Sequence, residues 1–316
     1  MRVSYHPDYR VDLPPTHPYP MGKYPLLHGL LRERGLLAER EIMVPQEAPL
    51  EMLGLVHEPA YLADLTAGTL SAADVRRLGV PLTARLWRRS RLAVHGTWLA
   101  ARAALADGLA ANGAGGTHHA FAGHGEGFCV LNDVAIAIRA LRAEGEIRRA
   151  LVIDLDVHQG NGTAAIFAGD PEVYTLSLHG ERNYPARKAT STHDVGLPDG
   201  TGDAEYLAAL GPALDAALDA ARPELAFYVA GVDVLAGDRY GRLALSEQGL
   251  RQRERHVLAR VRASGVPLAI VLGGGYAAST LRTAELHAVV FEEARALDPR
   301  PAQGTGGGGL GGGSRA

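Results

Sequence analysis

The chain has 316 residues, of which 47% are hydrophobic and 21% charged, and its formal net charge is -3. This composition is typical of a soluble globular protein, and the charge gives no reason to expect nucleic acid or an acidic membrane as the main partner. The single cysteine, Cys129, excludes an internal disulfide, and residues 1–20 lack the apolar segment of a secretion signal. No apolar run approaches the roughly 20 residues that span a bilayer. We therefore expect a cytoplasmic protein that binds neither nucleic acid nor membrane.

The N-terminal third is predicted to consist of loop and helix. The first 25 residues are rich in His, Pro and Tyr, which favours ordered loop. Residues 21–37 have the pattern of a short amphipathic helix, and residues 91–113 that of a long helix that stops at its Asn-Gly pair. The basic run at 85–91 is interpreted as a solvated helix face rather than a nucleic-acid site.

The rest of the chain alternates strands with helices. Four apolar runs are predicted to be buried parallel strands, at residues 150–154, 173–178, 225–231 and 267–273. Helical patterns at 204–221 and 246–263 separate the later strands, and this alternation predicts a doubly wound α/β sheet. Because no internal linker is evident, we predict one domain over residues 1–300, followed by a disordered Gly-rich tail at 301–316.

Polar residues follow each of the four predicted strands. In chain order these are Asp154, Asp156 and His158, then His179, then Asp233, and finally the run Gly273 to Tyr276. Ligands of open α/β sheets bind at the carboxyl ends of the strands, which meet at one edge of the sheet. The sequence therefore predicts one shared site.

The first strand end has the pattern of a metal site. Asp154, Asp156 and His158 occupy alternate positions, so in an extended chain they project to one face. One interpretation is that they are hydrogen-bonded polar groups at a strand end. Burying unpaired carboxylates is costly, however, and a divalent cation removes that cost. Two carboxylates and an imidazole with an open position form a plausible catalytic zinc set, and Asp233 is the natural third ligand.

Two features favour one metal ion over two. A dinuclear site needs further bridging carboxylates. Asn161 stands where another acid would be expected, and Asp233 is followed by Val234 and Leu235. A binuclear amidinohydrolase is therefore disfavoured.

A glycine-rich loop carries His118 and His119, and such a loop can turn both rings toward a pocket. Metal-assisted hydrolysis needs a base and an acid, a dual role that fits His119, with His118 shaping the electrostatics and Asp154 orienting one imidazole. Alternatively, one or both histidines lie on the surface. Tyr276 follows three glycines, and its hydroxyl could donate to a developing oxyanion, although a simple turn with a packed ring also fits this run.

Several motifs together resemble those of the histone deacetylase superfamily: GGTHHAF…GEGFCVLND, VIDLDVHQGNGT, YTLSLHG, AGVDVLAGD and LGGGY. These zinc amidohydrolases include histone deacetylases, acetylpolyamine amidohydrolases and acetoin-utilisation proteins. The resemblance covers most of residues 1–295, and HPYPMGKYPLL and DLDVHQGNG are most similar to the class IV group and its bacterial relatives. It implies the arginase/deacetylase α/β fold, with a central parallel sheet of about eight strands flanked by helices.

The resemblance also implies the metal ions. It assigns zinc to Asp156, His158 and Asp233, in agreement with the strand-end pattern, and iron(II) could replace zinc in vivo. It further implies a structural potassium ion. The residues expected beside potassium are Asp154, Asp156, His158, Ser177 and Leu178.

For the catalytic groups, the resemblance makes His119 the general base and acid, and His118 an electrostatic partner paired with Asp154. Tyr276 would polarise the scissile carbonyl. Asn161 would orient His119, at a position where class I enzymes carry Asp. This departure should alter how basic His119 is.

The resemblance places Gly127, Phe128, Tyr184 and Tyr240 along the substrate tunnel, and the glycine run adds Gly274. The carbonyl of Gly127 would accept the substrate amide N–H, and Phe128 would form one wall. Tyr184, where the family often has Phe, would form the opposite wall, and Tyr240 replaces a frequent aliphatic or Met residue. Gly274, in the glycine run before Tyr276, lets the backbone lie close to the ligand.

We therefore expect a zinc-dependent amide hydrolase that removes an acetyl or longer acyl group from a lysine side chain or a related primary amine. Its partners would be an acylated lysine peptide or protein, or an acylated small amine. Three alternatives stay open: an acetylpolyamine amidohydrolase, a binuclear ureohydrolase, and a catalytically silent acyl-ligand binder. The intact ligand set and His pair argue against the silent binder. The sequence carries no signal for the oligomeric state.

Overall fold

The computed structural model describes residues 1–297, and the segment 301–316, which the sequence predicts to be disordered, lies outside them. Eight strands form one all-parallel sheet in the order β2-β1-β3-β8-β7-β4-β5-β6. The strands are β1 (Arg2–Ser4), β2 (Ile42–Met43), β3 (Leu109–Asn112), β4 (Ala150–Asp154), β5 (Val173–Gly180), β6 (His193–Leu197), β7 (Leu225–Val229) and β8 (Leu268–Val271). The predicted doubly wound α/β sheet is confirmed.

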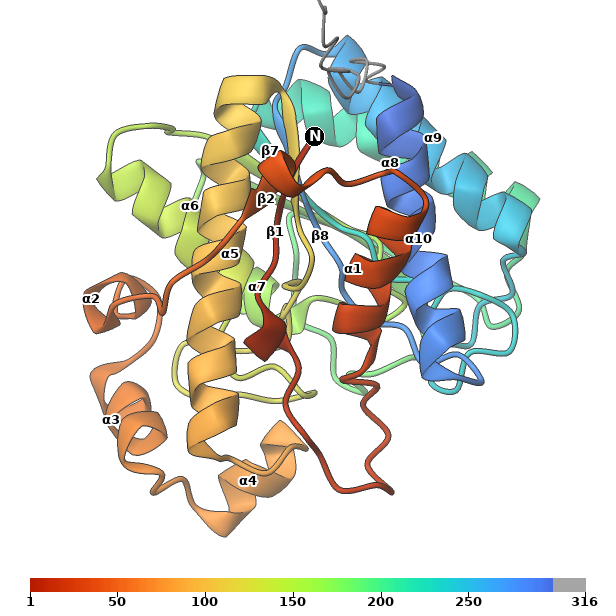
Figure 1. Ribbon diagram of the computed structural model, residues 1–316. Coiled ribbons are helices and arrows are strands. Elements are labelled where there is room, and N and C mark those ends of the chain that lie inside the picture. Colours follow the sequence, from red (N-terminus) through yellow and green to blue (C-terminus); the bar gives the residue numbers. More distant parts are fainter. Residues whose placement is uncertain (298–316) are drawn as a thin grey trace, which may run out of the picture.

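Helices cover both faces of the sheet (Figure 1). On one face α5 crosses β1, β3 and β8 and packs against α6, and on the other face α8 packs on β4 and β5 beside α9, α10 and α1. The helices are α1 (Lys23–Glu33), α2 (Leu50–Leu53), α3 (Pro59–Ala67), α4 (Ala72–Leu78), α5 (Ala84–Asp107), α6 (Asp133–Ala143), α7 (Asn161–Ile166), α8 (Asp203–Ala221), α9 (Glu247–Ala263) and α10 (Thr280–Leu297), with 3-10 turns η1 (Pro7–Tyr9) and η2 (Glu39–Glu41). None of the helices within residues 1–297 is long and apolar enough to cross a membrane.

The central strands β4, β7 and β8 are almost entirely apolar because both of their faces are buried. In β4, Leu151 and Ile153 pack into the core on the side of α8 and α9, whereas Val152 packs into the core on the side of α5 and α6. Successive side chains of a strand point to opposite faces, so a strand covered by helices on both sides reads as a continuous apolar run. This pattern is why the four predicted strands are found as β4, β5, β7 and β8.

The predicted helix at 91–113 is wrong at both ends. Helix α5 starts earlier, at Ala84, and ends at Asp107, because Gly108 adopts a left-handed conformation with φ of +86°. The residues after it, Leu109–Asn112, form β3 between β1 and β8. A strand of four residues is too short for a periodicity that distinguishes strand from helix, and β1, inside the segment predicted as loop, is shorter still.

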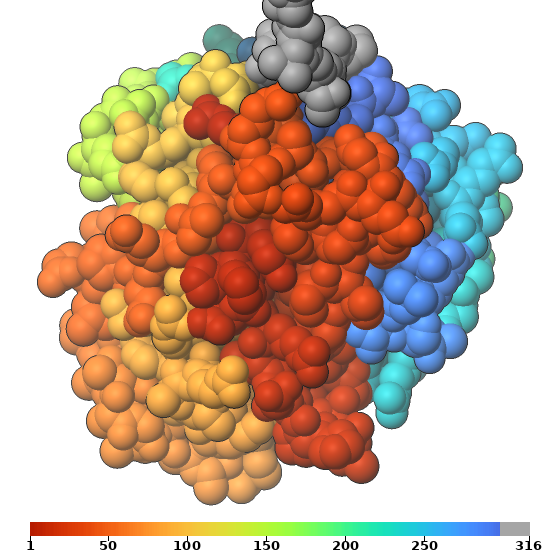
Figure 2. Space-filling model, in the orientation of Figure 1, coloured from red at the N-terminus to blue at the C-terminus, as the bar shows by residue number. Residues whose placement is uncertain are grey.

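The basic run at 85–91 is only partly solvated. Arg89 is buried, its guanidinium lies 4.9 Å from the centroid of the Tyr24 ring, and its Nε donates to the carbonyl of Tyr9. Helical periodicity turns one residue of such a run toward the core. In Figure 2 the N-terminal part of the chain, in red, lies over this side of the molecule between the gold and blue segments. The outer Arg88 pairs with Asp8 and Glu47.

Candidate active site

The predicted site residues lie in loops that leave four neighbouring strands at their carboxyl ends. The strands β3, β8, β7 and β4 are adjacent in the sheet. The loops after them carry His118 and His119, then Gly273 to Tyr276, then Asp233, and then Asp156 and His158. A parallel arrangement brings all four loops to one edge, so residues separated by up to about half the chain line one pocket.

Asp156, His158 and Asp233 form the one group of three potential metal ligands found within residues 1–297, and all three are buried. The Nδ1 atom of His158 lies 2.9 Å from Asp156 Oδ1 and 3.2 Å from Asp233 Oδ2. The hydrogen on Nδ1 is directed to Asp156, which leaves Asp233 Oδ2 without a hydrogen-bond donor in the described chain. A buried carboxylate oxygen of this kind is suited to a cation.

The electrostatics of this group also favour a cation. Burial and the neighbouring Asp156 carboxylate raise the pKa of Asp233 to about 6. Against the effect of burial, the adjacent Asp156 and Asp233 carboxylates raise the pKa of His158 to about 10. The protein thus holds two carboxylates in a buried space where positive charge must balance them, and a divalent metal ion would supply that charge.

Backbone groups fix the two carboxylates. The N–H of Gly274 donates to Asp156 Oδ2 at 2.6 Å, and the N–H of Val157 donates to Asp233 Oδ1 at 2.9 Å. A Cβ atom at Gly274 would overlap Asp233 Oδ2 and lie 2.7 Å from Asp156 Oδ2. Only glycine lets the backbone approach both carboxylates so closely. Gly274, expected near the substrate, therefore lies against the candidate metal ligands.

The expected strand geometry of the DxDxH motif is wrong in one respect. Strand β4 ends at Asp154, and residues 156–158 form a bend rather than extended chain. The alternation of a pleated strand therefore does not align these side chains. A backbone N–H bond from His158 to Asp156 Oδ1, 3.0 Å long, shapes the bend and brings the ligands together.

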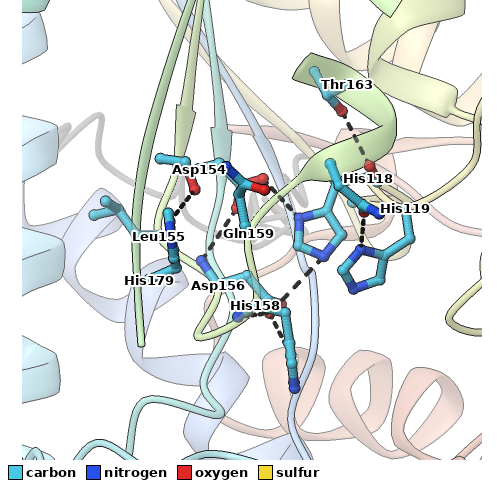
Figure 3. Close-up of polar contacts among 12 residues, drawn as sticks. His118, His119, Asp154, Leu155, Asp156, His158, Gln159, Thr163 and His179 are labelled. Atoms are coloured by element: carbon cyan, nitrogen blue, oxygen red, sulfur yellow. Dashed lines mark hydrogen bonds and ion pairs between the residues drawn. The ribbon is translucent and has the colours of Figure 1, made fainter. Parts of the chain in front are cut away.

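The two adjacent histidines have separate hydrogen-bond partners (Figure 3). Nδ1 of His118 lies 2.6 Å from Asp154 Oδ2, and Nδ1 of His119 lies 2.7 Å from Asn161 Oδ1. The ring centroids of the two histidines are 4.1 Å apart, and both rings are buried. The Gly-rich loop thus turns both imidazoles into the pocket, and neither is a surface histidine.

Their surroundings push the two imidazoles toward opposite protonation states. Although burial acts in the other direction, the Asp154 and Asp156 carboxylates raise the pKa of His118 to about 9. Burial, together with the positive charges on His118 and His158, holds the pKa of His119 well below its usual range. His119 is therefore the neutral imidazole, and a neutral imidazole is what a general base requires.

The loop that carries the histidines is held from behind by the start of α6. Asp133 accepts hydrogen bonds from the backbone N–H groups of Gly116 and Thr117 at 3.1 and 2.8 Å. Asn132 caps α6 and donates to the carbonyl of Ala120 at 3.1 Å. The LND segment of the sequence thus positions the His-His loop.

A third histidine, His57, secures the same region from the other side. Its Nε2 accepts the backbone N–H of Asn132 at 3.0 Å, so its Nδ1 carries the hydrogen and faces the carbonyl of Ala122 at 3.3 Å. Both partners suit a neutral ring. Burial lowers the pKa of His57 to about 4 from the usual 6.5.

Because the pKa is lower in the folded state, the unfolded chain takes up a proton first as the pH falls below 6.5. The contribution of His57 to stability is therefore complete above that pH and is lost as the pH falls toward 4. Between pH 7 and 5 this loss is about 2 kcal/mol. In His57→Gln the free energy of unfolding, measured by urea denaturation at both pH values, should fall by about 2 kcal/mol less than in the wild type. Equal decreases would contradict this role.

Aromatic side chains line the outer part of the pocket, where Phe128, Tyr184, Tyr240 and Tyr276 meet. The Tyr276 ring packs edge-on against Tyr240, with centroids 4.9 Å apart, and the Tyr184 ring packs edge-on against His119, also at 4.9 Å. The four predicted aromatic residues are therefore brought together around an outer pocket that His119 also lines.

Residues 127 and 128 have an unusual backbone. Gly127 has a φ of +56°, and a Cβ there would lie 2.6 Å from Cδ2 of His119. Phe128 has a φ of +69°, which costs a residue other than glycine about 1 kcal/mol or more. The N–H of Phe128 donates to the carbonyl of Leu78 at 2.8 Å. The strained loop directs the Phe128 ring into the pocket lining.

Of the residues expected beside potassium, Asp154 ends β4 and Ser177 and Leu178 lie on β5, whereas Asp156 and His158 lie in the bend after β4. Asp154 and Ser177 are register partners in the sheet, and Leu178 follows on β5. The Oγ atom of Ser177 lies 2.9 Å from Nδ1 of His179. Potassium binding by these residues stays a prediction.

The sequence did not indicate Glu126 and Arg77 as residues of the site. Glu126 accepts hydrogen bonds from Asn161 Nδ2 at 2.6 Å and from the Tyr184 hydroxyl at 2.7 Å. Arg77, at the end of α4, lines the outer pocket. Glu126 could have been found as the acid of GEGFC, between two glycines that allow close approach. Arg77 carried no such signal, because the approach of α4 to the pocket is a tertiary contact.

Comparisons with known proteins agree with this site. The family model for the histone deacetylase domain matches residues 17–291. An uncharacterised protein of Picosynechococcus is 48% identical over 293 residues, covering 93% of this chain and 98% of its own length. Histone deacetylase 2 of Arabidopsis thaliana is 34% identical over 276 residues, covering 84% of this chain and 71% of its own.

Among solved structures, the HDA15 HD domain has the same fold. It superposes with a TM-score of 0.75 at 23% identity, over 93% of this chain and 88% of that chain. Its identity is low enough that it supports the fold alone, whereas the family model and the Arabidopsis relative bear on the activity class. The chain belongs to the histone deacetylase family and is an amide hydrolase of the deacetylase type.

Proposed function

We propose that this protein is a zinc-dependent deacylase that removes an acetyl group from a primary amine, such as the ε-amine of lysine. The observation that carries the proposal is that a buried candidate metal group shares one pocket with a neutral imidazole and a tyrosine. The pocket lining includes Asp156, His158, His119 and Tyr276. The class IV-like grouping is part of the proposal and rests on the motifs HPYPMGKYPLL and DLDVHQGNG.

The donor set fits zinc. Asp156, His158 and Asp233 offer two carboxylates and one imidazole, and Asp233 Oδ2 has no other partner in the described chain. Three protein ligands leave a position for water and substrate, as in catalytic zinc sites. Iron(II) would accept the same ligands. A potassium ion beside Asp154 and Ser177 belongs to the same proposal.

The residues of the chain divide the reaction between them. When bound, the metal would polarise the acyl carbonyl and acidify a water molecule. Nε2 of His119 takes the proton of the attacking water, and the Tyr276 hydroxyl donates to the carbonyl oxygen as it becomes negative. His119 then returns the proton to the amine nitrogen as the C–N bond breaks, which yields acetate and a free amine. Phe128 and Tyr184 exclude bulk water from the acyl-lysine stem.

The test is acetate release from an acetyl-lysine peptide by metal-stripped protein, before and after zinc is added. We expect release only with zinc. Iron(II) added in place of zinc, without oxygen, distinguishes the two metals. One zinc bound per chain, with no acetate released from acetyl-lysine peptides or acetylpolyamines and no longer carboxylate released from longer acyl-lysines, would contradict the proposal and favour a silent binder. Two bound metals would favour the ureohydrolase.

Replacing Gly274 by alanine should weaken metal binding. The added Cβ would overlap Asp233 Oδ2 and displace one carboxylate, so the affinity for zinc should fall about 10- to 100-fold. Competition with a chromogenic chelator measures the change. Gly202→Ala is a control for another loop glycine, because Gly202 has a negative φ and a Cβ there meets no atom closer than 3.6 Å. Unchanged zinc affinity in Gly274→Ala would contradict the assignment of these ligands.

The charge at the pocket mouth favours acyl-lysine over acetylpolyamine. Arg77 is the one permanently charged residue that lines the outer pocket. An acetylpolyamine carries further ammonium groups, which Arg77 repels, whereas a peptide need not. Arg77→Glu should therefore raise kcat/KM for a monoacetylated polyamine, relative to a neutral acetyl-lysine peptide, by about tenfold at low salt. A ratio that does not change, or that is insensitive to salt, would contradict this role.

A further inference from the structure

Glu126 connects the two sides of the pocket through one carboxylate oxygen. Its Oε1 accepts from Asn161 Nδ2 at 2.6 Å and from the Tyr184 hydroxyl at 2.7 Å, and its Oε2 lies 3.4 Å from Nε2 of His124. The side chain of Glu126 is only 13% exposed. A carboxylate so enclosed has few partners to choose from, so its contacts are well defined.

These contacts fix the orientation of the Asn161 amide. An ionised carboxylate only accepts hydrogen bonds, so Asn161 must turn its NH₂ group toward Glu126. Its Oδ1 then faces Nδ1 of His119, 2.7 Å away. An amide oxygen also only accepts, which requires the hydrogen of His119 to sit on Nδ1. Nε2 of His119 is left with its lone pair for the pocket.

An asparagine at position 161 needs a second hydrogen-bond partner to fix the orientation of its amide. A carboxylate at position 161 would accept from His119 Nδ1 through either oxygen. An amide has one accepting and one donating end, and its two orientations are nearly equal in shape. Without a fixed acceptor on its other side, Asn161 could present its NH₂ group to His119 and favour the wrong tautomer. Glu126 removes this ambiguity.

We propose that Glu126 is a positioning residue that acts through Asn161 to hold His119 in the tautomer of a general base. The inference rests on the proposed function and names a residue that sets the competence of its base. We call the chain of contacts from Glu126 through Asn161 to His119 the relay. Tyr184 donates to the same Glu126 oxygen, so the relay also connects this wall of the tunnel to His119. Burial and the Glu126 carboxylate raise the pKa of Tyr184, which keeps its hydroxyl a donor.

The test is a double-substitution cycle of Glu126→Gln and Asn161→Asp, with kcat and zinc content measured for all four proteins. In the wild-type background, Glu126→Gln should lower kcat about tenfold at unchanged zinc content, because Asn161 is no longer fixed. In the Asn161→Asp background, the same substitution should raise kcat. In Asn161→Asp alone, the introduced carboxylate and that of Glu126 would repel each other across the 2.6 Å distance that a hydrogen bond now spans. Glu126→Gln removes this repulsion.

A merely structural role of Glu126 does not predict this reversal of sign. Glu58→Gln is the matched control, because the exposed Glu58 side chain lies beside Gly123 of the same loop and makes no contact with Asn161. Its kcat should stay within about twofold of the wild type. A lower kcat for Glu126→Gln in both backgrounds, or in neither, would overturn the proposal.

A second readout is independent of catalysis. In metal-free protein, two-bond ¹H–¹⁵N correlation spectra report the tautomer of each imidazole, and the His119 signals are identified by their loss in His119→Ala. We expect the Nδ1–H tautomer in the wild type and a mixture of tautomers in Glu126→Gln. The same tautomer in both would overturn the relay. If the two proteins differ in this way but the wild type releases no acetate with zinc, the relay stands and the proposed function is refuted.

Discussion

Tyr276→Phe should lower kcat by about 10²- to 10³-fold while zinc content stays the same. The substitution removes one hydroxyl and keeps the ring, which packs against Tyr240 and Phe128. Burial holds the pKa of Tyr276 well above its usual range, so the hydroxyl is a permanent donor. The backbone N–H of Tyr276 also donates to Asp238 Oδ2 at 2.7 Å, a bond that the variant retains.

The loss is large because the hydroxyl is pre-positioned for charge that develops only in the transition state. Steady-state kinetics with an acetyl-lysine peptide, together with zinc analysis, measure it. Tyr240→Phe is the comparison, because Tyr240 lines the pocket beside Tyr276 and its substitution should act mainly on KM. A kcat for Tyr276→Phe within about threefold of the wild type would exclude the hydroxyl from the proposed mechanism.

His119→Ala should lower kcat by about 10³- to 10⁴-fold, again with zinc retained. The substitution removes the proposed base and acid together, whereas the metal ligands keep their backbone hydrogen bonds from Gly274 and Val157. The neighbouring His118 cannot replace it, because its Nδ1 is bound to Asp154 and the Asp154 and Asp156 carboxylates raise its pKa.

Chemical rescue makes this second result specific. The variant leaves space for a small base in the pocket, so added imidazole should restore part of the rate. Kinetics with and without imidazole, at constant zinc content, are the measurement. Near-wild-type activity without imidazole would show that another group takes the proton. Loss of zinc in the variant would show that His119 supports the metal group instead.

The sequence by itself determined the central part of the fold and the composition of the site. The runs that became β4, β5, β7 and β8 are largely apolar because helices cover both faces of the sheet, and their alternation with helical segments indicated a parallel sheet. Each strand has its polar residues just after its last apolar one. Since parallel strands end at one edge, the sequence assigns the candidate metal ligands, the His pair and Tyr276 to one pocket.

The tertiary structure decided the features that depend on contacts between residues far apart in the chain. Leu109–Asn112 is a strand because β1 and β8 provide its hydrogen bonds, and four residues are too few to show a period. Arg89 is buried because Tyr9 and Tyr24 lie over it. Asp156 and His158 converge through a bend held by a backbone bond and by Gly274, not through the pleat of a strand. Short hydrogen bonds between groups far apart in the chain leave no local pattern.

Glu126 shows the same division within the site. The sequence shows an acid in a glycine-rich loop, and an asparagine 35 residues later. Neither position indicates that they touch, because the contact forms only when the loop after β3 and the start of α7 meet at the edge of the sheet. Residue types are fixed by chemistry that can be read along the chain, whereas the orientation of an amide or the tautomer of an imidazole depends on which groups the fold places beside it.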